Sequence, residues 1–164
     1  MASIRLLVMD VDGTLTDGRI YIGPQGEVMK AFHVQDGYGI AQLLPRAGIV
    51  PAIITGRCSA IVEQRARELH IEELHQGVSD KLGRLQEIAR RQGISAGEIA
   101  YIGDDLNDLA CMRFCVMSAC PSDAVPEVRG AADYVCKREG GRGAVREYID
   151  HLIALAEAPE ENAL

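Results

Sequence analysis

Acidic side chains gather at two places in the chain, each directly after a short apolar run. Asp10 and Asp12 stand in the stretch DVDGT, and Asp104, Asp105 and Asp108 stand in the stretch GDDLND. Clustered carboxylates repel one another unless a cation lies between them. Oxygen ligands with open positions for water and a phosphate suit Mg²⁺, whereas zinc would favour His or Cys, and the four histidines lie outside both stretches. The two stretches therefore predict a magnesium site.

A hydroxyl and two cations complete the set of residues that could do chemistry. Thr55, Gly56 and Arg57 follow another apolar run, and Lys81 opens a helical pattern after GVSD. Each piece alone has an ordinary explanation, because Asp-Gly is a common turn, Asp and Ser are common helix caps, and most lysines lie at the surface. The pieces together, in this order, favour a centre that handles an anionic group.

The elements that must position these residues alternate between strands and helices. Short apolar runs predict buried strands, and apolar residues at helical spacing predict helices near residues 61–69, 82–93 and 145–156. This alternation is typical of a doubly wound, Rossmann-like α/β domain, with a parallel sheet and helices on both faces. Ligands in such sheets bind at the carboxyl ends of the strands, where all the motifs above would meet. The predicted strands are residues 4–9, 49–55, 99–103 and 114–118, with a weaker one at 133–136.

One segment departs from the alternation. Two strand-like stretches flank Gly23-Pro24-Gln25-Gly26, which predicts a β-hairpin over about residues 18–34, inserted after the first strand. Asp17-Gly18 would begin this hairpin, so Asp17 is interpreted as a structural residue rather than a catalytic one.

Composition and charge limit the partners. The chain has 164 residues, a composition that is 48% hydrophobic and a formal net charge of −7, which argues against non-specific binding to nucleic acid. No apolar run approaches the length of a membrane span, and the N-terminal run is too short for a signal peptide. The expectation is one cytoplasmic domain that does not bind a membrane.

The five cysteines allow two interpretations. The spacing of Cys111, Cys115 and Cys120 superficially resembles a metal cluster, but zinc sites favour shorter paired spacings. The surrounding MRFCVMSAC is interpreted as a buried strand, so small buried thiols are the favoured interpretation.

In order, spacing and context, DVDGT, ITGR, Lys81 and GDDLND resemble the four signature motifs of the haloacid dehalogenase-like phosphohydrolases. The resemblance implies that Asp10 attacks phosphorus and forms an aspartyl-phosphate, while Asp12 acts as general acid and then general base. Thr55 and Lys81 would bind the phosphoryl oxygens. Mg²⁺ would be held by the Asp10 carboxylate, the Asp12 backbone carbonyl and Asp104, with Asp105 and Asp108 as supporting carboxylates.

The intervals between the motifs are too short for an inserted cap domain, so residues 1–157 are expected to form one capless domain. A capless monomer would leave its reaction centre open to water. We therefore expect a homo-oligomer with Ile20–His33 at its interface; the alternative is a hairpin that merely decorates an edge. The tail 158–164 is expected to be disordered, which leaves open whether it reaches a neighbouring active site.

The hairpin, VQDGYGI at 34–40 and GGRGAVRE at 140–147 resemble the 3-deoxy-D-manno-octulosonate 8-phosphate phosphatases, and this resemblance implies that the oligomer is a homotetramer. The alternative is a phosphatase of nine-carbon 2-keto sugar acid phosphates, a branch in which a glutamate commonly follows the Thr-Gly; here that residue is Arg57, which can pair with a substrate carboxylate or phosphate. Arg142, among glycines that permit close approach, is a second candidate anion contact or else a solvated loop residue. A non-catalytic, regulatory relative is disfavoured because the motif residues are intact.

Overall fold

The computed structural model describes residues 3–158, and its centre is a six-stranded sheet in the order β5-β4-β1-β6-β7-β8. Every neighbouring pair in this sheet is parallel. The central strand β1 is fully buried, as a strand covered on both faces must be. The strands are β1 (Leu6–Met9), β4 (Val50–Ile54), β5 (Glu73–His75), β6 (Ile99–Ile102), β7 (Met117–Cys120) and β8 (Tyr134–Val135).

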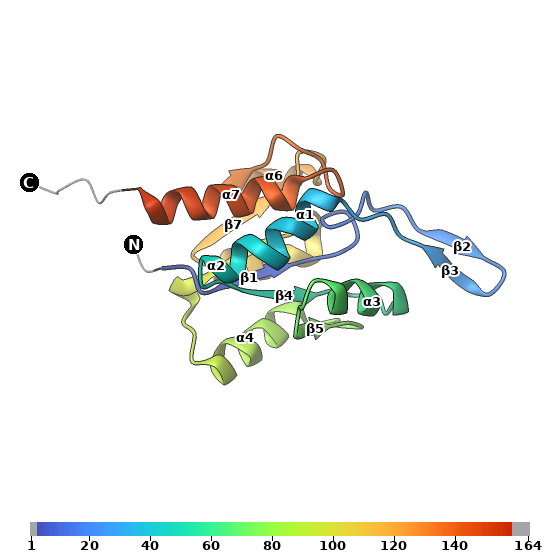
Figure 1. Ribbon diagram of the computed structural model, residues 1–164, viewed down its shortest axis with the longest axis horizontal. Helices are drawn as coiled ribbons and strands as arrows, with labels where there is room; N and C mark the ends of the chain where they lie inside the picture. Colours follow the sequence, from blue (N-terminus) through green and yellow to red (C-terminus); the bar gives the residue numbers. More distant parts are fainter. Residues whose placement is uncertain (1–2, 159–164) are drawn as a thin grey trace, which may run out of the picture.

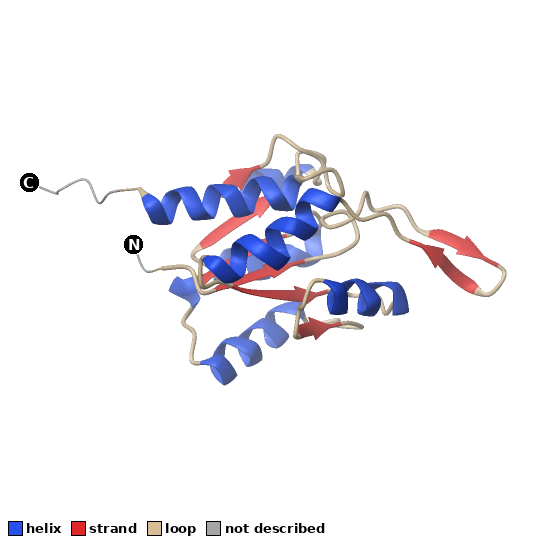
Figure 2. Ribbon diagram, viewed as in Figure 1, coloured by secondary structure: helices blue, strands red, loops and turns tan. Residues whose placement is uncertain are grey.

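Helices cover both faces of this sheet (Figure 1, Figure 2). On one face Leu7 and Met9 of β1 pack in a core with residues of α3 and α7 and of the helical segment from α1 to α2. On the other face Leu6 and Val8 pack with residues of α4, α5 and α6. The bounds are α1 (Val34–Tyr38), η1 (Gly39–Leu43), α2 (Leu44–Arg46), α3 (Ala60–Glu68), α4 (Lys81–Gln92), η2 (Ala96–Glu98), η3 (Leu106–Asp108), α5 (Leu109–Phe114), α6 (Pro126–Ala131) and α7 (Ala144–Glu157). The doubly wound α/β prediction is confirmed.

The predicted hairpin is present and extends away from the sheet (Figure 1). Strands β2 (Tyr21–Gly23) and β3 (Gly26–Met29) pair antiparallel around the turn at Pro24 and Gln25. Between the motifs, the part of the chain from 3 to 158 contains no inserted domain larger than this hairpin.

One predicted strand was placed too early. Residues 112–114 of MRFCVMSAC lie in α5, and the strand begins only at Met117. The apolar residues Cys111, Met112 and Cys115 face the core from the end of a helix, and a short apolar run does not distinguish a buried helix from a buried strand.

The prediction of small buried thiols at Cys111, Cys115 and Cys120 is confirmed. Cys111, Cys115, Cys120 and Cys136 are buried, free thiols, and burial raises the pKa of each of them. Cys58 is exposed, because it lies in the loop before α3.

Within the described range, no helix is both long enough and apolar enough to cross a membrane.

Candidate active site at the carboxyl ends of β1 and β6

Three carboxylates meet where β1 and β6 end. Asp10, Asp104 and Asp108 each offer an oxygen, and the three oxygens lie within 4.8 Å of one another. Asp10 follows β1 directly and is only 5% exposed, while Asp104 follows β6 after Gly103. Because β1 and β6 are parallel neighbours, their carboxyl ends deliver these side chains to the same edge of the sheet. The structure thus brings together residues that are far apart in the sequence.

Lys81 is the cation of this cluster. Its side chain is 2% exposed, and its Nζ lies 2.9 Å from Asp10 Oδ1 and 2.7 Å from Asp108 Oδ1. A lysine is buried to this extent only when it is paired. Lys81 is the first residue of α4, and Asp80 caps that helix by accepting a hydrogen bond from the backbone N–H of Gly83. The cap fixes the start of the helix and therefore the direction of the lysine.

Asp108 is saturated with hydrogen bonds. Its Oδ1 accepts from Lys81 and from the Tyr101 hydroxyl, at 2.7 and 2.6 Å, and its Oδ2 accepts from the backbone N–H groups of Asp104 and Asp105, at 3.0 and 3.3 Å. A carboxylate with this many donors has little capacity left for a metal ion. Asp108 is therefore better suited to orient Lys81 and the 104–105 turn than to bind an ion directly.

The cluster has too much negative charge for one lysine. Burial, followed by the charge of Asp108, raises the pKa of Asp10 to about 6, against the opposing effect of Lys81. Burial, followed by the charge of Asp10, raises the pKa of Asp104 to about 8, although a hydrogen bond from Thr14 opposes the rise. Ionising both groups thus costs free energy in the protein alone, and a divalent cation between them would remove that cost. The residues present fit a hard cation with oxygen ligands.

The loop after Asp12 packs closely on this cluster. Gly13 has a φ of 96°, and a Cβ there would overlap the Asp104 carboxylate. The Thr14 hydroxyl donates to Asp104 Oδ1 at 2.9 Å. Asp105 instead is exposed, and its Oδ1 accepts a hydrogen bond from the Leu106 N–H at the start of η3. Of the two predicted supporting carboxylates, only Asp108 is therefore part of the cluster.

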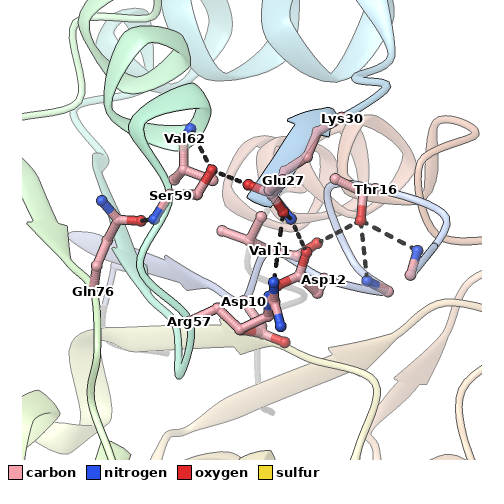
Figure 3. Close-up of polar contacts among 12 residues, drawn as sticks. Asp10, Val11, Asp12, Thr16, Glu27, Lys30, Arg57, Ser59, Val62 and Gln76 are labelled. Atoms are coloured by element: carbon pink, nitrogen blue, oxygen red, sulfur yellow. Dashed lines mark hydrogen bonds and ion pairs between the residues drawn. The ribbon is translucent and has the colours of Figure 1, made fainter. Parts of the chain in front are cut away.

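The Asp12 side chain lies outside the three-carboxylate group and faces the hairpin (Figure 3). Its Oδ1 is ion-paired with Lys30, and its Oδ2 is 3.7 Å from Arg57 Nε. Lys30 also pairs with Glu27 at 2.8 Å. Asp10 and Asp12 thus leave the same strand end in different directions, which suits two separate tasks.

Thr55, Gly56 and Arg57 follow β4, the strand beside β1. Thr55 is buried, and its backbone bridges the end of β5 and the next loop, because its N–H donates to the His75 carbonyl and its carbonyl accepts from the Val78 N–H. Gly56 is exposed, and the Arg57 side chain is 49% exposed, so both are open to a ligand.

Arg142 does not reach the carboxylate cluster. Its guanidinium is largely exposed and pairs with Glu139 at 3.2 Å, beside a surface pocket of about 240 Å³ lined also by Asp17 and His33. The close approach expected of the neighbouring glycines is made to the protein itself, because the Gly141 N–H donates to the Thr14 carbonyl at 3.0 Å. The glycine loop therefore supports the loop that carries Asp12. Asp17 accepts from the Arg19 N–H at 3.0 Å, as fits a turn residue.

Four polar residues of this region could not be identified as site residues from the sequence. Tyr101 looks like an apolar core residue of β6, and Thr14 stands inside a motif without an assigned task. Lys30 and Glu27 are separated from every motif, and their only signal is an opposite-charge pair three residues apart on the hairpin.

A family model described as haloacid dehalogenase-like hydrolase matches residues 52–149. The chain belongs to this family. The match spans the segment from β4 into α7 and includes Thr55, Lys81 and Asp104.

Similar proteins share nearly the whole chain. A curated Yersinia pestis protein, 3-deoxy-D-manno-octulosonate 8-phosphate phosphatase KdsC, is 48% identical over 99% of this chain and 86% of its own length. A crystal structure of the phosphatase of that name from Yersinia pestis superposes with a TM-score of 0.89, at 49% identity, over 94% of this chain and 82% of the other. The corresponding Moraxella catarrhalis structure, in complex with magnesium, phosphate and KDO, gives a TM-score of 0.88 at 44% identity, over 92% and 86% of the two chains.

Proposed function

We propose that this protein is a Mg²⁺-dependent phosphatase that hydrolyses 3-deoxy-D-manno-octulosonate 8-phosphate to the free sugar acid and phosphate. One observation carries the proposal: the chain is nearly half identical, over almost its full length, to a phosphatase of this substrate, and its Asp10, Asp104 and Lys81 lie together at the carboxyl edge of the sheet. The similarity to these phosphatases indicates the sugar phosphate, and the cluster indicates phosphoryl transfer.

The reaction needs a nucleophile and an acid–base group, and we assign these tasks to the two diverging aspartates. Asp10 attacks phosphorus, and the bond from phosphorus to the sugar oxygen breaks while Asp12 donates a proton to that oxygen. Water then attacks the aspartyl-phosphate, Asp12 takes its proton, and the bond from phosphorus to Asp10 breaks. Lys81 and Thr55 hold the phosphoryl oxygens during both steps.

Mg²⁺ would be bound by the carboxylates of Asp10 and Asp104 together with the Asp12 backbone carbonyl. When bound, it neutralises the charge that the phosphate and the carboxylates accumulate. Asp108 holds Lys81 and the 104–105 turn in place, and Asp105 caps the start of η3 near the site.

The anionic end of the sugar acid requires a cation outside the phosphate site. Arg57 is half-exposed next to Thr55 and Gly56, and we assign to it the substrate's second anionic group. Arg142 lies further out, beside the pocket with His33, where its Nε pairs with Glu139, and we propose it as a second candidate contact for an anionic group.

We further propose that the chain works as a homo-oligomer, most simply a homotetramer, joined through the hairpin. Four large apolar side chains of β2 and β3 are exposed on it: Tyr21, Ile22, Val28 and Met29, with Ile22 73% exposed. Apolar surface gathered on a projecting element is typical of a protein–protein contact. A monomer of about 18 kDa in light scattering with full activity would contradict this assignment.

We also propose that residues 1–157 form one capless domain and that the protein is cytoplasmic. The tail beyond residue 158 lies outside the described residues.

The test of the function is phosphate release from octulosonate 8-phosphate, a nine-carbon 2-keto sugar acid phosphate and simple hexose phosphates, each with and without Mg²⁺. We expect the octulosonate ester to be turned over fastest and activity to disappear on chelation. Equal rates on all sugars would overturn the substrate assignment, and full activity after exhaustive chelation would overturn the metal dependence.

A further inference from the structure

The side chain of Lys30 is almost completely buried, and none of the four sequence motifs includes this residue. It directly follows β3 at the base of the hairpin, and its side chain is 1% exposed. A buried ammonium group is costly unless it is paired, and Lys30 is paired twice, with Asp12 Oδ1 and with Glu27 Oε1. A buried cation is therefore paired with one oxygen of Asp12, the residue assigned as the acid–base group.

The position of Lys30 is fixed from a second element. The Ser59 hydroxyl donates to Glu27 Oε2, and the same hydroxyl accepts from the Val62 N–H at the start of α3 (Figure 3). The Ser59 backbone N–H donates to Gln76 Oε1 at 2.8 Å. A continuous series of polar contacts thus runs from the start of α3 through Glu27 and Lys30 to Asp12, and it ties the hairpin base to the body of the domain.

These contacts leave the two oxygens of Asp12 unequal. Oδ1 is occupied by Lys30, while Oδ2 faces Arg57 at 3.7 Å, beyond hydrogen-bond distance. A proton transferred to or from the substrate needs an oxygen that is not already bound by a fixed donor. Oδ2 meets this condition and Oδ1 does not.

We propose that Lys30 is a positioning residue that holds Asp12 by Oδ1, so that Oδ2 is the atom that gives a proton to the leaving oxygen. This inference rests on the proposed function, because it needs Asp12 as the general acid. Lys30 itself touches no reacting atom. Glu27 and Ser59 are the support that keeps Lys30 in place.

The test compares esters that need a general acid with esters that do not. An alkyl or phenyl phosphate releases a poor leaving group and depends on Asp12, whereas p-nitrophenyl phosphate releases a good one and depends on it little. The value of kcat/KM reports the steps up to release of the alcohol, so it isolates this proton transfer from hydrolysis of the aspartyl-phosphate. For Lys30→Met we expect kcat/KM to fall about 10-fold or more on octulosonate 8-phosphate and phenyl phosphate, and less than about 3-fold on p-nitrophenyl phosphate.

Two further variants make the result independent of folding. Glu27→Gln keeps the lysine but removes the negative charge of one of its two partners, and we expect the same preference for good leaving groups, to a smaller degree. Lys137→Met removes an exposed lysine elsewhere, and its kcat/KM ratio between the two aryl esters should equal that of the unmodified protein. Because each ratio is measured on one sample, the fraction of folded protein cancels.

Asp12→Asn distinguishes a failure of the general-acid assignment from a failure of the Lys30 proposal. If Asp12→Asn lowers all esters equally, the general-acid assignment in the proposed function fails. If Asp12→Asn discriminates strongly against poor leaving groups and Lys30→Met does not, the Lys30 proposal alone is overturned. A uniform loss on every ester in Lys30→Met would likewise overturn it, because that is the effect of a purely structural residue.

Discussion

Two charged clusters lie side by side at the end of β1, and they differ in how their charges balance. The carboxylate cluster sets Asp10, Asp104 and Asp108 against Lys81 alone. The hairpin cluster sets Asp12 and Glu27 against Lys30 and Arg57. Two carboxyl pKa values are raised in the first. In the second, burial alone would raise the pKa of Glu27, but the hydrogen bonds from Lys30 and Ser59 outweigh it and lower that pKa.

The carboxylate cluster needs a further cation besides Lys81, whereas the hairpin cluster already has a positive charge for each of its carboxylates. A buried group of acids with too little positive charge lowers the stability of the folded protein when it ionises, so a bound cation raises that stability most there. A balanced group is stable without a ligand and suits the fixed placement of a side chain. The neighbouring residues Asp10 and Asp12 therefore have different chemical settings, although both stand in the same short motif.

The largest expected effect is loss of the nucleophile in the carboxylate cluster. Asp10→Asn keeps the shape of the side chain but cannot form the aspartyl-phosphate, so we expect kcat to fall by roughly 10⁴-fold or more. Steady-state phosphate release measures it. Circular dichroism of the same sample is the control for folding, and turnover within 10-fold of the unmodified protein would contradict the assignment.

The second prediction compares the two clusters directly through Mg²⁺ affinity. Asp104→Asn removes a proposed ligand from the unbalanced cluster, and we expect Mg²⁺ binding to weaken by about 10- to 100-fold. Glu27→Gln changes the balanced cluster, and we expect its Mg²⁺ affinity to stay within about 2-fold. Isothermal titration calorimetry with MgCl₂ measures both. An equal loss in the two variants would remove the distinction between the clusters.

The third prediction concerns pH. The pKa values of Asp10 and Asp104 are raised in the folded protein from 3.8 to about 6 and about 8. Their contribution to stability is therefore fully present below about pH 4 and is lost as the pH rises toward 8. Mg²⁺ binds the ionised forms and should offset this loss, so we expect it to raise Tm more at pH 8 than at pH 5. Thermal melts with and without MgCl₂ at both pH values are the measurement, and an equal rise in Tm at the two would count against the prediction.

The smallest expected effect lies in the support of the hairpin cluster. Ser59→Ala removes the N-cap of α3 and the hydroxyl that donates to Glu27. We expect the free energy of unfolding to fall by about 1 kcal/mol. Urea denaturation measures it, with Ser59→Thr as the variant that keeps the hydroxyl. If the alanine variant were as stable as the parent, the cap would have no energetic role.

The two clusters also differ in how far the sequence could predict them. Asp10 directly follows β1, one residue separates Asp104 from the end of β6, and Lys81 begins α4. Parallel strands bring their ends together, so the convergence follows from the order of the elements. Lys30 and Glu27 lie on a hairpin whose direction depends on tertiary packing, and nothing in the local pattern shows that they fold back toward Asp12.

The fold was likewise predictable in its central strands and in α4, but not in β5 or in the helical segment 34–46. Strands β1, β4 and β6 are continuous apolar runs, and Gly93, with a φ of 62°, ends α4 where the sequence indicated a stop. The edge strand β5 has only three half-buried residues, Glu73 to His75, and shows no apolar run. The helical segment 34–46 was not predicted either, because Gly37, Gly39 and Pro45 disfavour a helix unless packing against α7 supplies the stability.

The central claim is that Asp10 carries the phosphoryl group during turnover. Its most direct test is rapid acid quenching of the Asp12→Asn variant after mixing with p-nitrophenyl phosphate and Mg²⁺, followed by peptide mass spectrometry. Without its general base the variant should hydrolyse the intermediate slowly, so we predict that a phosphoryl group accumulates on Asp10. A phosphoryl group on any other residue, or nitrophenol release in many turnovers without a labelled peptide, would contradict it.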